Sequence, residues 1–444
     1  MEGKLWGGRF KGKVDKNFEE FSSSIRYDYK LAKFDIYHSM IHILALKEAN
    51  ILTSDEYERL NQALENILRD VEEGRFSYHH LSEDIHTDIQ NKVSNIVGNL
   101  GDKLHTLRSR NDQVSFDEKW YCIEEIDEAI DLLKDLVNVF KGVYRKFKRE
   151  FFIAYTHTRR AQIITFKDYI DTFSRMFNSD KERLSSLRRR EKVYIGSGAV
   201  SGTVLKDAYK KAIKIFTNKR GFDFIPIELS SSPPFNVSNR DFIIEFLSCL
   251  AILQMHLSRL CEDLILYSTQ EFNYFILPEE FCTGSSLMPH KKNPDFLELV
   301  RGYTGIVYGN LFSLLTTMKG LPLTYNRDMQ LDKEPLFSSV DIVKEELKIM
   351  IEFIERIELN KSSVEEALKD DSLYATELVQ FLVFQGLAFK EAHKIIGQLV
   401  RYCEDKKASL KDMSDEELKK FHAYLTVSNL KKIMNPRYVV SLRK

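Results

Sequence analysis

A short segment of this chain, residues 284–295, combines groups that bind and stabilise negative charge. It holds the hydroxyl of Ser285, the ammonium groups of Lys291 and Lys292, and a proline, Pro294, near which a helix is expected to begin. Backbone amides at such a helix start favour an anion, and nearby lysines add to that field. The segment predicts a site for a carboxylate, or for the doubly charged intermediate formed when a proton leaves the carbon beside one. An ordinary surface loop is the alternative interpretation.

A second polar segment, residues 104–114, contains Arg110 and Asn111. Guanidinium and amide groups suit a multi-donor grip on carboxylate oxygens. The same segment also fits the polar start of the long helix that follows it, with Asp112 favoured by the helix dipole. The residues alone leave both interpretations open.

Two more segments carry candidate functional residues. His157 follows the apolar residues 151–154, and by itself such a histidine is more often a hydrogen-bonded structural residue than a catalyst. Residues 324–335 separate two expected helices, and their density of polar side chains exceeds what a connection requires. Because long polar loops between bundle helices are often functional, we expect this segment to contribute to a site.

Composition excludes several classes of protein. The 444 residues include 65 basic and 66 acidic side chains, a formal net charge of -1, which argues against a general nucleic-acid or anionic-membrane binder. The five cysteines show no Cys-x-x-Cys spacing, which favours a reducing compartment and gives no sign of a structural zinc site. The first residues lack a secretion signal, and no run approaches the roughly 18 apolar residues of a membrane span. We expect a soluble, cytoplasmic protein.

Long helices must position these segments. Apolar residues recur at alternating spacings of three and four from Ile123 to Phe147, which predicts a helix of about 35 residues. Similar patterns cover residues 246–264, 297–314 and 340–354, and the first of these three is expected to be too polar for a membrane. Such patterns predict an all-α chain whose helices pack nearly parallel in a bundle. Because the apolar faces are so long, we expect subunits to associate.

The rest of the chain predicts shorter helices on either side of the bundle. The first hundred residues predict helices at 36–50 and 54–73, with Thr53 or Ser54 as an N-cap of the second. A polar break at 358–363 follows the bundle, Gly386 is expected to end one later helix, and residues 390–401 to form another. We expect three domains, and their boundaries are 1–107, 108–358 and 359–444.

Two tempting motifs are set aside. The glycine-rich run 196–202 does not match the dinucleotide-binding pattern, and no strand, turn and helix unit surrounds it. The basic run 188–190 is expected to be a solvated helix end, because the chain as a whole is not basic.

The run Gly-Ser-Ser-Leu-Met-Pro-His-Lys-Lys-Asn-Pro at 284–294 resembles the signature of the fumarase, aspartase and argininosuccinate lyase superfamily. Three further runs resemble the argininosuccinate lyase branch: Leu-Trp-Gly-Gly-Arg-Phe at 5–10, Arg-Ser-Arg-Asn-Asp-Gln at 108–113 and Asn-Arg-Asp-Met-Gln at 326–330. The resemblance extends from Leu5 to about Val400. It implies a three-domain, all-α lyase fold that forms a homotetramer, in which each active site draws on three chains.

The resemblance also implies a reaction, the β-elimination that cleaves argininosuccinate to L-arginine and fumarate in the last step of arginine biosynthesis. Ser285 would be the base, and Lys291 and Asn293 would bind the carboxylate whose charge grows. His157, paired with Glu298, would supply a proton to the leaving nitrogen. The substrate contacts that the resemblance implies are Ser24, Arg110, Asn111, Thr156, Tyr325, Gln330 and Lys333. No metal or organic cofactor is implied, and neither a nucleic acid nor a membrane is expected as a partner.

Several positions depart from the pattern of the branch. Leu107 replaces a usual glycine, Thr158 and Arg159 replace Leu-Gln, and His290 replaces a usual glutamine. Two further departures are Asn239 in place of Asp and Ile163 in place of Pro. Because Met-Pro-His-Lys is more typical of adenylosuccinate lyase, that enzyme is the alternative function. A non-catalytic scaffold is less favoured, since Ser285, His157 and Lys291 are all present.

Overall fold

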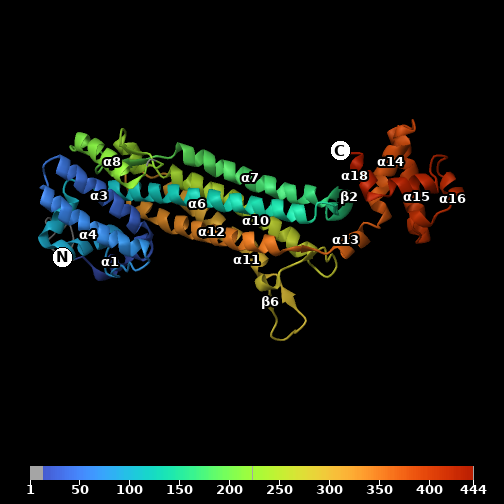
Figure 1. The fold of residues 1–444 in the computed structure, drawn as a ribbon, viewed down its shortest axis with the longest axis horizontal. Helices are drawn as coiled ribbons and strands as arrows, with labels where there is room; N and C mark the ends of the chain where they lie inside the picture. Colours follow the sequence, from blue (N-terminus) through green and yellow to red (C-terminus); the bar gives the residue numbers. More distant parts are fainter. Residues whose placement is uncertain (1–13, 223, 444) are drawn as a thin grey trace. The chain divides into compact units, whose positions relative to one another are not determined.

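The computed structural model describes residues 14–222 and 224–443, and it is mainly helical, as predicted (Figure 1). The Leu-Trp-Gly-Gly-Arg-Phe run at 5–10 lies outside the described residues. The chain divides into two compact units. Unit 1 combines the chain up to Leu132 with Asp180–Gln254 and Tyr303–Glu345, and unit 2 combines Leu133–Ser179, Met255–Gly302 and Glu346–Lys444. The predicted division into three domains stays a prediction.

The amino-terminal helices belong to unit 1 and confirm both short helices predicted there. They are α1 Lys16–Ser22, α2 Ile25–Asp28, α3 Ala32–Glu48, α4 Ser54–Glu72 and α5 Ile85–Val97. Thr53 caps α4 through a reciprocal pair of hydrogen bonds with Glu56, so the predicted N-cap is correct. Helix α3 buries nearly all of its residues, with α4 and α8 (Lys206–Arg220) packed against it. It is therefore the core helix of this end of unit 1.

Four long helices confirm the predicted apolar patterns. They are α6 Arg110–Lys146, α10 Asp241–Tyr267, α11 Asp295–Met318 and α12 Lys333–Arg356. Helix α6 is 37 residues long, close to the predicted length. A fifth long helix, α7 Phe166–Arg190, was not predicted, although its buried residues Phe166, Phe173 and Phe177 follow helical spacing. Arg188 to Arg190 form its last turn, as expected for the basic run.

Helix α10 corrects one expectation from the sequence. Its mean hydropathy of 1.4 over an 18-residue window makes it long and apolar enough to cross a membrane, so the prediction that it is too polar was wrong. However, 56% of that window is buried within the protein. A core helix passes the same compositional test, so this is weak evidence for a membrane span.

The strands form small two-stranded sheets between the helices. Two are hairpins, β1 Phe151–Thr156 with β2 Arg159–Thr165, and β6 Thr283–Gly284 with β7 Lys292–Asn293. The other pairs are β3 Val193–Ile195 with β4 Ile227–Leu229, and β5 Phe275–Ile276 with β8 Glu358–Leu359. Neither hairpin was predicted, because β1 lacks strict polar alternation and β6 and β7 have only two residues each. Most of the segment 284–294 thus forms the tip of a hairpin.

The remaining elements are short. Helix α9 Pro233–Ser238 lies in unit 1, and unit 2 ends with α13 Lys361–Ala367, α14 Ala375–Phe384, α15 Phe389–Lys406, α16 Asp415–Lys419, α17 Val427–Ile433 and α18 Pro436–Ser441. Single 3-10 turns connect several of these elements. Gly386 follows the end of α14 with a φ of 100°, a conformation that glycine adopts without strain, which confirms the predicted helix stop.

Aromatic side chains fasten the β1–β2 hairpin to its neighbours in unit 2. The Phe152 ring lies 4.8 Å from Tyr169 of α7, 5.7 Å from Tyr267 of α10 and 5.7 Å from Tyr274, measured between ring centroids. All four rings are buried. Such pairs stabilise packing beyond the area they bury. The base of the hairpin is therefore rigidly held, whereas its tip is exposed.

Candidate active site

Ser285 lies at the tip of the β6–β7 hairpin, and its hydroxyl oxygen is surrounded by backbone donors. The Oγ atom accepts hydrogen bonds from the amide of Leu287 at 3.3 Å and from the amide of Met288 at 3.0 Å. Amides aimed at a hydroxyl oxygen would also stabilise the alkoxide formed when the hydroxyl loses its proton. The local geometry therefore suits the role of base that the family resemblance implies for this serine.

The two lysines after Ser285 differ in their surroundings. Lys292 forms an ion pair with Glu279, which neutralises much of its charge. Lys291 is exposed, and its ammonium group has no hydrogen-bond or ion-pair partner among the described residues. Lys291 is therefore the cation available for an incoming carboxylate. Asn293, in β7, is half-buried at the base of the same hairpin.

Helix α11 begins directly after this hairpin, at Asp295, as predicted from Pro294. Asp295 accepts a hydrogen bond from the Thr283 hydroxyl, which ties β6 to the helix start. Glu298 lies in the first turn of α11 and is exposed. The first-turn amides and Lys291 thus belong to one continuous segment, and the anion site predicted there stays a prediction.

Thr156 and His157 lie at the tip of the other hairpin. His157 and Thr158 form its two-residue turn, and both have positive φ values, 52° and 57°. Such turns favour glycine or asparagine, and a β-branched threonine in this conformation is strained. His157 is exposed, and its imidazole makes no hydrogen bond to a described residue, so its catalytic role stays a prediction. Strain at an exposed polar tip is typical of functional segments.

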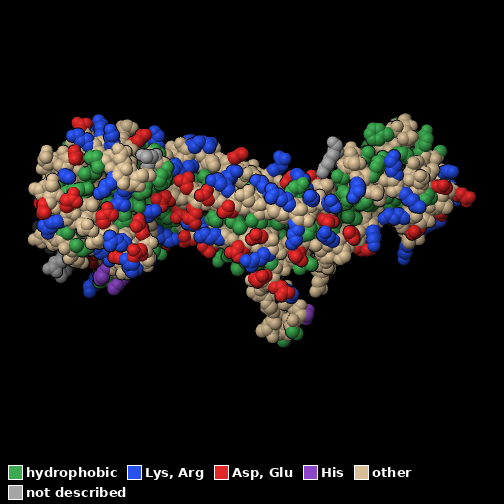
Figure 2. Space-filling model, in the orientation of Figure 1, with side chains coloured by type: hydrophobic (Ala, Val, Ile, Leu, Met, Phe, Trp, Pro, Cys, Tyr) green, Lys and Arg blue, Asp and Glu red, His purple; other side chains and the backbone are tan. Residues whose placement is uncertain are grey.

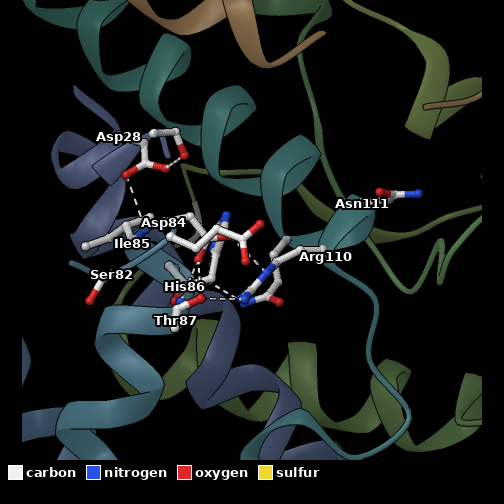
Figure 3. Close-up of polar contacts among 12 residues, drawn as sticks. Asp28, Ser82, Asp84, Ile85, His86, Thr87, Arg110 and Asn111 are labelled. Atoms are coloured by element: carbon white, nitrogen blue, oxygen red, sulfur yellow. Dashed lines mark hydrogen bonds and ion pairs between the residues drawn. The ribbon is translucent and has the colours of Figure 1, made fainter. Parts of the chain in front are cut away.

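In unit 1, Arg110 lies at the start of α6 and is held by Thr87 of α5 and by Asp84, the N-cap of α5. Its Nε atom lies 3.1 Å from Asp84 Oδ2, and its Nη2 atom donates to Thr87 Oγ1 at 2.8 Å (Figure 3). Asp84 also caps α5 by accepting from the Thr87 amide at 2.7 Å. Arg110 Nη1 is buried without a partner among the described residues. The guanidinium is therefore fixed in orientation and keeps one donor for a ligand.

The pKa of Asp84 reflects this arrangement. Burial raises the pKa, but the charges of Arg110 and His86 and hydrogen bonds from Thr87 outweigh it, so that the pKa lies below its usual value. Asp84 is therefore a carboxylate at neutral pH. Its charge balances that of Arg110.

The Asn111 side chain does not point to the same place as that of Arg110. Its Nδ2 atom donates to the carbonyl of Ala199 at 3.1 Å, and Figure 3 shows the two side chains pointing in different directions. The neighbouring Asp112 accepts from the amides of Gly196 and Ser197, both at 2.9 Å. The glycine-rich run 196–202 is thus a loop anchored on α6 between β3 and α8, so the expectation that no strand, turn and helix unit surrounds it was wrong. The helix-start interpretation of residues 104–114 is correct, and it is compatible with a role for Arg110.

Ser24 and Gln330 of unit 1 are both hydrogen-bonded to the segment around α2. Ser24 is buried, and its hydroxyl donates to Asp28 Oδ2 at 2.5 Å. Gln330 donates to the carbonyl of Ser22 at 3.1 Å and to the Tyr27 hydroxyl at 3.2 Å. The 324–335 segment therefore packs on the same part of unit 1 as Ser24.

Lys333 is buried and paired with carboxylates, whereas a residue that contacts substrate is expected to be accessible. It is 3% exposed, and its ammonium lies 2.5 Å from Glu118 and 3.0 Å from Asp332. Arg240, 1% exposed, lies 3.1 Å from Glu118 and 2.5 Å from Asp332. Two buried cations and two buried carboxylates thus form one neutral cluster. Tyr325 is nearby in the chain, and burial raises the pKa of its hydroxyl.

One group of side chains has the composition of a metal site. Ligand atoms of Asp35, His86 and Asp117 lie within 4.8 Å of one another, and all three residues are buried. The His86 Nδ1 atom lies 2.8 Å from Asp35 Oδ1, so the nitrogen facing the group already serves a carboxylate. Arg108 also brings a positive charge toward both carboxylates. We interpret the group as part of a buried ion network.

The structure assigns the predicted site residues to two sets. Unit 1 holds Ser24, Arg110, Asn111, Tyr325, Gln330 and Lys333, and unit 2 holds Thr156, His157, Ser285, Lys291, Asn293 and Glu298. Sequence reasoning missed the residues that position the first set, namely Asp28, Asp84, Thr87, Glu118, Arg240 and Asp332. Asp84 before an apolar helix is an N-cap pattern that could have been noticed, whereas the buried partners of Lys333 carry no local signal.

The fold and the sequence agree with known lyases. The family described as Lyase matches residues 8–309. A solved EDDS lyase variant with bound fumarate has a TM-score of 0.77 and 21% identity, covering 98% of this chain and 86% of the other. A class II fumarase from Schistosoma mansoni has a TM-score of 0.77 and 14% identity, covering 96% of this chain and 95% of the other. At these identities the structural likeness establishes the fold alone.

More similar relatives define the branch. The family described as Argininosuccinate lyase C-terminal matches residues 372–441. Argininosuccinate lyase of Clostridium kluyveri is 43% identical over 424 residues, which cover 94% of each chain. That of Caldanaerobacter subterraneus is 43% identical over 420 residues, covering 94% of this chain and 93% of the relative. The chain belongs to the argininosuccinate lyase family and is a carbon–nitrogen lyase.

Proposed function

We propose that Ser285 is the base of an elimination that this chain performs on argininosuccinate. The reaction releases L-arginine and fumarate and is the last step of arginine biosynthesis. The observation that supports Ser285 most directly is the pair of backbone amides at its hydroxyl oxygen, from Leu287 and Met288. A serine acts as a base only if its alkoxide is stabilised, and preorganised amides provide that stabilisation.

The other proposed groups of unit 2 bind the substrate carboxylate and protonate the leaving group. Lys291, which has no partner among the described side chains, and Asn293 bind the carboxylate beside the carbon that loses its proton. Negative charge grows on this carboxylate in the transition state, so a cation placed there lowers the barrier. His157 gives a proton to the leaving guanidinium nitrogen. Glu298 orients the imidazole, and its negative charge favours the protonated form. No metal or organic cofactor takes part in the proposed mechanism.

The groups of unit 1 hold the substrate. Arg110 binds a substrate carboxylate through its unpaired Nη1 donor while Asp84 and Thr87 keep it oriented. The other proposed contacts are Ser24, Asn111, Thr156, Tyr325, Gln330 and Lys333. Lys333 is almost fully buried, so it acts through the charged cluster that it forms with Glu118 and Asp332.

We propose further that the active form is a homotetramer with active sites shared between subunits. Helix α11 supports this, because it exposes six large apolar side chains along its length. They are Leu299, Tyr303, Ile306, Tyr308, Phe312 and Leu315. Gly302, Gly305 and Gly309 of the same helix have open space where a side chain would point, which lets another helix approach closely. An apolar face of this kind marks a protein–protein interface.

The proposed setting is the cytoplasm, with a small-molecule substrate and neither a nucleic acid nor a membrane as partner. Acidic and basic side chains are interspersed on the face shown in Figure 2, in keeping with the net charge of -1. A mixed surface of this kind does not attract polyanions.

The function is tested by measuring fumarate released from argininosuccinate, adenylosuccinate and aspartate by the purified protein. Fumarate from argininosuccinate is expected, and fumarate from adenylosuccinate alone would overturn the assignment. Ser285→Ala is expected to lower kcat by about 10²–10⁴-fold, because a general base contributes that much. Ser286→Ala is the matched control, with near-normal turnover expected. Near-normal turnover by Ser285→Ala would remove that serine from the role of base.

A further inference from the structure

Unit 2 contains a cavity of about 370 Å³ that none of the proposed catalytic groups lines. It is bounded by the β1–β2 hairpin, α7, α10 and the turn after α10. Five of its lining residues are aromatic, namely Tyr155, Tyr169, Phe173, Tyr267 and Phe272. Ligand pockets of proteins start at about 300 Å³, so the cavity has room for a small molecule.

Three polar side chains line the cavity, and they are Tyr169, Asp263 and Arg259. The Tyr169 hydroxyl is buried and makes no hydrogen bond within the usual distance and angle limits. Burial and the nearby Asp263 carboxyl both raise its pKa. Buried hydroxyls are nearly always hydrogen-bonded, so this one is suited to a ligand. Asp263 itself is half-buried. Arg259, one turn earlier on α10, is exposed and has no ion-pair partner among the described residues.

These groups together specify the chemistry of an occupant. Arg259 and Asp263 are four residues apart on α10, so they lie on one face of the helix and offer opposite charges within a short distance. The aromatic rings between them and the hairpin attract cations through their faces. A suitable ligand therefore carries a carboxylate, an apolar arm and a cationic group.

We propose that this cavity is an effector site for an α-amino acid with a cationic side chain. The side chain lies among the aromatic rings and meets Asp263 and the Tyr169 hydroxyl, while the ligand carboxylate meets Arg259 at the rim. L-arginine, the product of the reaction proposed above, belongs to this class, and the inference rests on that proposed function for its regulatory meaning.

The charge of Asp263 agrees with this assignment. Burial raises its pKa to about 6, against smaller lowering effects of Tyr169 and Arg259. At neutral pH the group is therefore mainly a carboxylate, and a bound cation would favour that form further.

The cavity is connected to the tip that carries His157. Ala154, Tyr155 and Thr158 line it, and they flank Thr156 and His157 in the chain. The Tyr155 ring lies 5.6 Å from Tyr267 and 5.6 Å from Phe272, and its hydroxyl is 2.7 Å from that of Tyr274. A ligand among these rings contacts the strand end that positions the imidazole. Occupancy therefore changes turnover without competing for the substrate site.

Two measurements test this inference on the full-length protein. In equilibrium dialysis with labelled L-arginine, two bound molecules per subunit are expected, one at the active site and one in the cavity. In initial-rate measurements, L-arginine is expected to change kcat as well as KM for argininosuccinate. The effect should be about fivefold or more, the usual lower end of coupling between two sites.

Three variants assign the second site. Asp263→Asn removes the carboxylate, and Thr172→Trp fills the cavity without changing its charge. Both variants are expected to bind one arginine per subunit, and L-arginine should inhibit them only competitively. Glu271→Gln, which changes an acidic residue outside the cavity, is the control and should keep both molecules. Circular dichroism of each variant reports folding.

The outcomes separate this inference from the proposed function. Fumarate release together with a single bound arginine and purely competitive inhibition would overturn the cavity assignment alone. Two bound arginines with no fumarate from argininosuccinate would overturn the proposed reaction and support the cavity. Unchanged binding in both folded cavity variants would also overturn the assignment.

Discussion

The candidate residues of unit 2 and those of unit 1 are held in opposite ways. In unit 2, His157 and Lys291 are exposed at hairpin tips, and their side chains make no hydrogen bond to a described residue. In unit 1, Arg110 and Lys333 are fixed by carboxylates, and Lys333 is almost fully buried. Groups that bind substrate benefit from fixed orientation, whereas groups that complete a site on binding need freedom to move. The contrast suggests that unit 1 is preorganised and that the tips of unit 2 adjust.

The buried cluster around Lys333 provides the strongest test of this contrast. Glu118→Ala leaves Lys333 and Arg240 with only Asp332 between them, and removing one partner of a buried pair costs about 3–5 kcal/mol. The free energy of unfolding, measured with denaturant, should fall by that amount. Glu279→Ala, which removes the exposed partner of Lys292, is the control and should leave stability unchanged. Equal effects of the two changes would contradict the contrast.

Asp28 predicts a pH dependence in the same preorganised region. Burial, followed by the charge of Asp84, raises the pKa of Asp28 to about 6, above its unfolded value of 3.8. The folded state therefore binds more protons than the unfolded state between these values, so stability should decrease as pH rises from about 4 to about 6.

The difference in pKa corresponds to at most about 3 kcal/mol. Asp28→Asn should remove the corresponding slope from denaturant curves measured across that range, because an amide does not titrate. The single oxygen of asparagine replaces only one of the two carboxylate oxygens, so either the Ser24 hydroxyl or the Ile85 amide loses its acceptor. A slope that persists unchanged in the variant would show that another group is responsible.

Asp84 tests whether the orientation of Arg110 matters for binding. Asp84→Asn removes the charge that faces Arg110, but asparagine remains a good N-cap for α5. We expect KM for argininosuccinate to rise about tenfold, which corresponds to about 1.4 kcal/mol, with a smaller change in kcat and little change in stability. A fall in kcat alone, at constant KM, would assign Asp84 to the chemical step.

The smallest expected effect is on stability and comes from the backbone conformation of Leu107. Its φ is 58°, a conformation that costs a residue with a side chain about 1 kcal/mol relative to glycine. Leu107→Gly should therefore raise the free energy of unfolding by about 0.5–1 kcal/mol. Leu107→Ala keeps the unfavourable φ and should show no such gain.

Much of the fold could be predicted because helix periodicity is local. The residues that form α6, α10, α11 and α12 repeat apolar side chains over many turns, so their spacing alone identifies them. Helix α7 had the same signal and was overlooked. The short strands β6 and β7 gave none, since two residues show no periodicity. The hydropathy of α10 was misjudged because a buried core helix and a membrane helix share their composition.

The candidate site was only partly predictable. The sequence by itself determined the family and the long helices and predicted an anion site at residues 284–295, because these depend on residue types at short spacings. Only the tertiary structure decided that Lys291 rather than Lys292 is without a partner, that Asp84 orients Arg110 and that Lys333 lies in a buried neutral cluster. Those features join residues far apart in the chain, and the energy of such contacts depends on distance and burial, which no local pattern encodes.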